Sequence, residues 1–138
     1  KDSTINFISS NLDLRYLNSV RVLANISSQD DWGKYMASVV QWNSNREQIR
    51  LNLVNYFSWE VAAQFIGETN DSNSKIPSTI YYKFVRLHNL LVQIRSGNTS
   101  KIKEAQDLLQ EIQKQRDILL TTMLEDLKID TRETSNFE

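Results

Sequence analysis

Residues 5–26 have the sequence INFISSNLDLRYLNSVRVLANI, and the spacing of their apolar side chains decides the fold class. Large side chains return every three or four residues, which places them on one face of an α-helix rather than on alternate faces of a strand. The segment therefore predicts a helix over residues 4–27. The residues of its apolar face are Ile5, Ile8, Leu12, Tyr16, Ser19, Leu23 and Ile26.

A second periodic segment covers residues 29–66. Ser28 is a typical N-cap, and Asp30 and Asp31 place acidic side chains at the positive end of the helix that follows. Within the segment, Asn43-Ser-Asn45 has low helix propensity, and Ser44-Asn-Arg-Glu47 has the spacing of a capping box. Two interpretations stay open: one long, bent helix, or two helices with a break near residue 44.

Two more helices follow a polar loop at residues 67–78. The first is expected over residues 78–96, where Arg95-Ser-Gly97 forms a stop signal, and the second over residues 100–128. The chain contains only three glycines and one proline, which is too few turn-forming residues for an all-β fold.

Short connections between consecutive helices make them antiparallel neighbours. The sequence therefore predicts an all-α fold, an up-down-up-down four-helix bundle. We expect one domain over residues 1–129, followed by a flexible polar tail over residues 130–138, where no apolar periodicity continues.

Composition excludes several classes of function. Sixteen basic and 17 acidic residues give a net charge of −1, which disfavours nucleic-acid binding because phosphate neutralisation requires a basic excess. The chain has no cysteine, which excludes disulfides and thiolate catalysis. His88 is the only histidine and has no metal-ligand spacing around it. No nucleophile or phosphate-loop motif occurs, so we expect neither an enzyme nor a cofactor.

Four polar residues fall where apolar side chains are expected. Asn43, Arg46 and Arg50 lie in the apolar stripe of segment 29–66, and Arg116 lies in that of segment 100–128. Burial of an unpaired guanidinium is costly, so each group needs a partner or an exit to solvent. One interpretation is that they reach the bundle edge or pair with carboxylates such as Asp13 or Glu60. The other is that they form a pocket for a small anion, because the planar guanidinium suits carboxylate recognition.

The first helix also carries apolar residues away from its main face. Phe7, Leu14 and Leu17 point to the opposite side, and Trp59 does the same in the second segment. These residues are either scattered surface side chains or a surface for self-association or a protein partner.

Two functions remain. The first is a non-enzymatic interaction or scaffold module. Since the chain starts at Lys1 rather than methionine, an upstream segment is expected, and it could be a membrane anchor. The alternative is a ligand-sensing input domain that binds a small anion. In length and in its paired termini, the chain resembles the four-helix-bundle extracytoplasmic domains of bacterial receptors, without sharing a motif with them. Those domains continue into a second membrane helix, whereas this chain ends in a polar segment.

Overall fold

The computed structural model describes residues 2–57, 59–66 and 79–136, with the side chains of residues 2, 59, 60, 64, 66 and 127–136 left undescribed. This part of the chain is helical and contains no strand. The elements are α1 (Asp2–Ala24), α2 (Gln29–Tyr56), α3 (Trp59–Ile66), α4 (Ile80–Arg95), the short 3-10 helix η1 (Thr99–Lys101) and α5 (Ile102–Asn136).

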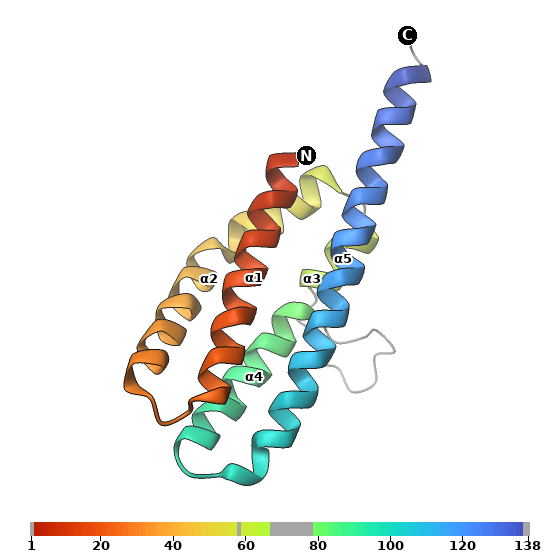
Figure 1. The fold of residues 1–138 in the computed structure, drawn as a ribbon. Coiled ribbons are helices and arrows are strands. Elements are labelled where there is room, and N and C mark those ends of the chain that lie inside the picture. Colours follow the sequence, from red (N-terminus) through yellow and green to blue (C-terminus); the bar gives the residue numbers. More distant parts are fainter. Residues whose placement is uncertain (1, 58, 67–78, 137–138) are drawn as a thin grey trace.

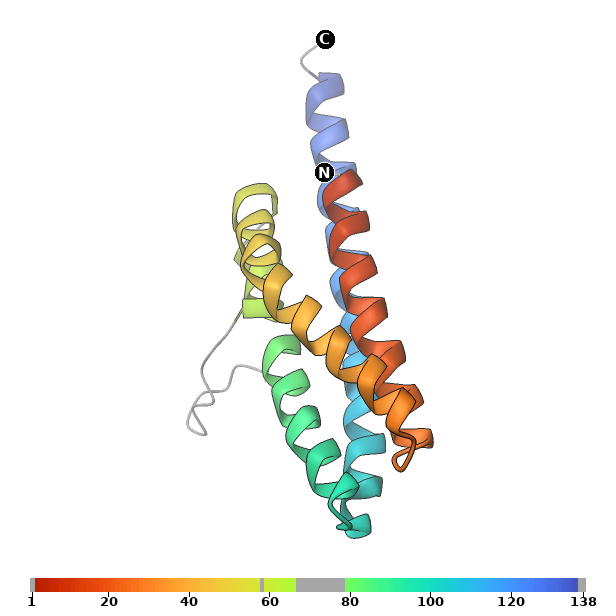
Figure 2. The same ribbon diagram turned by 90° about the vertical axis from the view of Figure 1, so that its left-hand side faces the viewer.

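The four long helices run up and down as the sequence predicts (Figure 1). Helix α1 packs antiparallel to α2 and beside α5, and α4 packs antiparallel to α5. The short helix α3 contacts α2, α4 and α5. The start of α1 and the end of α5 lie at the same end of the bundle, and Figure 2 shows α2 diverging from α1 toward α3. Among the described residues, no helix is long and apolar enough to cross a membrane.

One core joins all five α-helices, because each contributes fully buried apolar side chains. Its largest members are aromatic or branched, which fills the space between helices that splay apart. They include Ile8, Leu12, Tyr35, Ile49, Leu53, Phe65, Phe84, Leu87, Leu91 and Ile112.

The predicted helix ends at Ser28 and Gly97 are confirmed. Ser28 accepts a hydrogen bond at its Oγ from the backbone N–H of Asp31, at 3.2 Å. Gly97 adopts a φ of 112°, the left-handed conformation that closes a helix C-terminus. Thr79 supplies a further N-cap, accepting from the backbone N–H of Tyr82 at 3.2 Å.

A helix break near residue 44 is wrong, because α2 continues through Asn43-Ser-Asn45. The polar side chains there bond elsewhere instead of capping a new helix. Ser44 Oγ donates to the backbone carbonyl of Val40 at 3.0 Å, and the Asn45 side-chain amide donates to Asn11 Oδ1 on α1 at 2.8 Å. An unbroken helix over residues 29–66 is also wrong, because α2 ends at Tyr56 and Phe57 is extended, with φ −131° and ψ 169°.

Residues 130–136, which the sequence analysis assigned to a flexible polar tail, continue α5 to Asn136. Residues 98–138 contain neither glycine nor proline, so no residue interrupts the helical backbone once the apolar stripe has ended. Figure 2 shows this end of α5 extending past the start of α1. Residues 137 and 138 and the predicted loop at 67–78 lie outside the described residues.

Candidate functional site

Arg15 is the most buried charged residue of the described chain, with only 3% of its surface exposed. It lies on α1 between Leu12 and Ser19, at helical spacings of three and four residues. Both neighbours are fully buried, so the spacing directs the Arg15 side chain into the centre of the bundle. There it reaches α4, which lies diagonally across from α1.

Two aromatic rings and the hydroxyls of Ser19 and Tyr35 contact the Arg15 guanidinium. Its central carbon lies 5.1 Å from the ring centroid of Tyr35 and 5.0 Å from that of Phe84, both cation–π distances. Nη1 donates to Ser19 Oγ at 3.1 Å. Nε is buried and has no hydrogen-bond partner, and among the described residues no carboxylate pairs with this guanidinium.

Burial lowers the pKa of Arg15, because the charged form loses its hydration. Arginine titrates so far above neutrality that the group stays charged at pH 7. The centre of the bundle therefore holds a positive charge that aromatic rings and two hydroxyls stabilise only in part.

Arg15 lines a cavity of about 170 Å³ between α2 and α4. The walls are mostly aromatic and aliphatic, and exposed Asn43 and Val85 stand where the cavity meets solvent. A second buried donor without a partner, the indole Nε1–H of Trp42, belongs to the same lining. The other lining residues are Val39, Tyr81, Phe84 and His88.

His88 closes one side of the cavity by a hydrogen bond to α2. Its Nδ1 lies 2.7 Å from the Tyr35 hydroxyl. Burial, together with the positive charge of Arg15, lowers the pKa of His88. The imidazole is therefore neutral at pH 7, so Tyr35 donates to Nδ1 and the remaining ring proton is assigned to Nε2. Burial raises the pKa of Tyr35, which keeps its phenol protonated.

The cavity thus combines one positive charge, unsatisfied donors and no carboxylate among its lining residues. A buried donor is normally paired, and an unpaired one costs about 1–3 kcal/mol. The group that would satisfy Arg15 Nε and Trp42 Nε1 is a hydrogen-bond acceptor, and a negatively charged acceptor would also balance the guanidinium.

Of the four predicted anion-site residues, one lines this cavity and a second contacts a lining residue. Asn43 lines its exposed side. Arg46 is exposed and covers Tyr81, a lining residue: its guanidinium carbon lies 4.6 Å from the ring centroid, and Nη1 donates to the Tyr81 hydroxyl.

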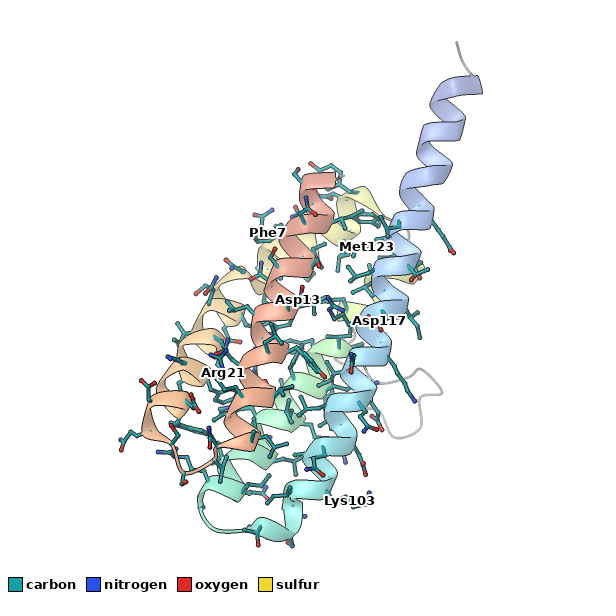
Figure 3. All side chains as sticks on the ribbon, viewed as in Figure 1. Phe7, Asp13, Arg21, Lys103, Asp117 and Met123 are labelled. Atoms are coloured by element: carbon teal, nitrogen blue, oxygen red, sulfur yellow. The ribbon has the colours of Figure 1, made fainter. Side chains whose placement is uncertain are left out.

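The other two arginines lie elsewhere, each beside a carboxylate. Arg50 Nε donates to Glu47 Oε1 at 3.1 Å on the exposed side of α2. Arg116 pairs with Asp13 on α1 and with Asp117 at 3.1 Å; the two aspartates lie on the facing helices α1 and α5 in Figure 3. The predicted pairing of Arg116 with Asp13 is confirmed, and Arg46, Arg50 and Arg116 are not among the lining residues of the cavity that Arg15 lines. The Glu60 side chain lies outside the described residues.

The predicted interface residues are also dispersed. Phe7 is partly buried and packs against the core, whereas Leu14 and Leu17 are 39% and 58% exposed on α1. The Trp59 side chain lies outside the described residues.

Arg15 was missed because the predicted apolar face of α1 was centred on Tyr16 and Leu23. The fully buried positions include Leu12, Ser19 and Val22, and with Arg15 they form a continuous three-and-four spacing that was visible in the sequence. Tyr16 instead faces α5, where its hydroxyl donates to Gln113 Oε1 at 3.2 Å.

Among the described side chains, no group of three or more histidine, cysteine, aspartate or glutamate residues is placed to hold a metal ion. Comparisons with known protein families, with characterised proteins and with solved structures found no match to this chain. The cavity and the exposed surface of α1 are therefore the two features that bear on function.

Proposed function

We propose that this chain is a non-enzymatic helical domain that binds a small anionic ligand in the cavity between α2 and α4. Arg15 supplies the counter-charge. The observation that carries the proposal is that two residues of one cavity lining, Arg15 and Trp42, each have a buried donor atom without a hydrogen-bond partner, Nε and Nε1. This function corresponds to the ligand-sensing alternative considered from the sequence, with a different arginine at its centre.

The energetic cost of the unliganded site supports the proposal. Each buried donor left without an acceptor costs about 1–3 kcal/mol, and a buried charge without a counter-ion costs more. These costs are large against a free energy of unfolding of only about 5–15 kcal/mol. An anion that accepts from these groups would offset the cost and stabilise the folded state.

The test is thermal unfolding of the whole chain in sodium acetate, in sodium phosphate and in sodium benzoate at fixed ionic strength. We expect a stabilisation that grows with ligand as RT ln(1 + [L]/Kd). Arg15→Gln should abolish it, whereas Arg21→Gln, an exposed arginine of the same helix, should leave it unchanged. An equal shift in both variants, or no shift with any of acetate, phosphate and benzoate, would overturn the proposal.

The interaction-module function is a second candidate, favoured by the exposed face of α1. Leu17 is 58% exposed, and Leu14 and Val20 on the same helix are 39% and 38% exposed. We propose that this face associates with a second copy of the chain, because three aliphatic side chains on one helix face suit a symmetric contact. Sedimentation equilibrium should show a dimer that Leu17→Glu dissociates; a monomer at all concentrations contradicts it.

A further inference from the structure

The cavity lining also narrows the chemical class of the ligand, and this inference rests on the proposed function. We infer that the ligand is a small monocarboxylate with an apolar body about the size of one aromatic ring. Benzoate is the simplest probe of this class. Three properties of the cavity carry the inference: its walls, its charge and its size.

The walls are hydrocarbon over most of their residues. Trp42 and Phe84 stand edge to face, with ring centroids 5.0 Å apart and planes 61° apart, and Tyr81 adds a third ring. Val39 and Val85 complete the apolar lining. Such walls favour a ligand that buries apolar surface, and they disfavour inorganic phosphate, which would lose hydration against them.

The charge of the lining matches a single negative group. Arg15 is the only lysine or arginine among the lining residues, and His88 beside it is neutral at pH 7. One guanidinium balances one carboxylate, whereas a second ligand charge would be buried against rings without a counter-ion.

The volume sets the size of the apolar body. The cavity measures about 170 Å³. An engineered apolar cavity of about 150 Å³ in another protein binds benzene, so the space here accommodates one six-membered ring. Because the cavity is partly open, beside exposed Asn43 and Val85, a substituent on the ring can extend toward solvent.

The experiment compares four probes by isothermal titration calorimetry on the full chain: benzoate, acetate, inorganic phosphate and benzyl alcohol. We expect the Kd of benzoate to be at least about tenfold lower than that of acetate, because only benzoate buries a ring. Benzyl alcohol, which has the ring without the charge, should bind at least about tenfold more weakly than benzoate.

The outcomes separate the two proposals. If acetate and benzoate bind equally and both require Arg15, the anion site stands and the ligand class is overturned. Tighter binding of phosphate or of benzyl alcohol also overturns the ligand class. If none of the three anions binds, both proposals fail.

Substitutions of exposed residues on α4 test benzoate binding without changing the buried core. Val85 and Val92 both lie on α4 and are each 41% exposed, but only Val85 lines the cavity. Val85→Asp should weaken benzoate binding about threefold or more by charge repulsion at the mouth, and Val92→Asp should not. Equal effects of the two variants would place benzoate elsewhere.

Trp42→Phe, which keeps a ring but removes the indole N–H, should also weaken benzoate binding; unchanged affinity would overturn the role of that donor.

Discussion

The Tyr35 hydroxyl and His88 Nδ1 lie 2.7 Å apart and join α2 to α4 beside the cavity. The bond requires a neutral imidazole as acceptor, and burial together with the charge of Arg15 holds the pKa of His88 below its ordinary value of 6.5. A protonated His88 would lose this acceptor and would place a second positive charge near Arg15.

Stability should consequently fall as the pH is lowered below about 6.5, the pKa of an unfolded histidine. The depressed pKa in the folded state means that the unfolded chain binds more protons over this range, so the free energy of unfolding rises with pH there. Urea unfolding between pH 5.5 and 7.5 measures the slope. The carboxyl groups of Glu47 and Glu104, whose pKa values are lowered by Arg50 and Arg86, titrate below this window.

The matched control is His88→Asn, which removes the titrating group and keeps a side-chain acceptor. His88 is the only histidine of the chain, so the variant should lose the slope between pH 5.5 and 6.5. A slope that persists in His88→Asn would show that another group is responsible.

Arg15→Met should raise the free energy of unfolding of the unliganded chain by about 1 kcal/mol. The substitution removes a buried cation and an unpaired donor and leaves an unbranched apolar side chain among Tyr35 and Phe84. Ser19 keeps a partner, because its Oγ donates to the backbone carbonyl of residue 15 at 2.7 Å. Guanidinium chloride unfolding checks the change. A loss of stability would assign Arg15 a structural role in place of the proposed binding role.

The residues around Arg116 provide a third prediction, because they form an ion-pair cluster outside the cavity. Arg116 is 24% exposed and pairs with Asp13 and Asp117, which are 41% and 62% exposed. Asp13→Asn should cost about 0.5–1 kcal/mol of stability, as expected for a partly exposed ion pair, and the cost should shrink at high salt.

Arg116→Gln should leave the Kd of benzoate unchanged within about twofold, because distant sites act independently. A larger loss of binding would return Arg116 to the site in which the sequence hypothesis had placed it. For Asp13→Asn and Arg116→Gln, calorimetry measures the Kd of benzoate and denaturant unfolding measures the stability.

The sequence predicted the four long helices because their periodicity and end signals are local. Ser28 and Gly97 mark two helix ends, and neither depends on distant contacts. The end of α2 at Tyr56 was not predictable in this way, because Asn43-Ser-Asn45 is the stronger local breaker and its bonds to Val40 and Asn11 form only in the folded chain.

The site was harder to predict than the fold because α1 packs against both α2 and α5, so its apolar face is broad. On such a broad face, a helical-wheel projection cannot distinguish an arginine at the centre from one at the edge. Arg46 and Arg116 also have partners on other helices. Asp13 on α1 pairs with Arg116 on α5, and Tyr81 on α4 contacts Arg46 on α2, so no single segment contains that information.

The same substitution, glycine to alanine, should have opposite effects at two positions of this fold. Gly33 lies in α2 with nothing within 4 Å of an added Cβ, so Gly33→Ala should stabilise the chain by about 0.5–1 kcal/mol through higher helix propensity. Gly97 follows α4 with a φ of 112°, while its N–H donates to Ile94 O and that of Asn98 donates to Gln93 O, each at 3.0 Å.

Those two bonds are the pair that closes a Schellman motif, and they require the left-handed conformation at residue 97. An added Cβ meets no neighbouring atom there, so the cost of Gly97→Ala is one of backbone strain alone, about 1 kcal/mol or more. Thermal unfolding of both variants under the same conditions shows whether each substitution raises or lowers the stability of the chain. If Gly97→Ala were as stable as the parent chain, the α4–η1 connection would not have this turn, and the antiparallel pairing of α4 with α5 would need another explanation.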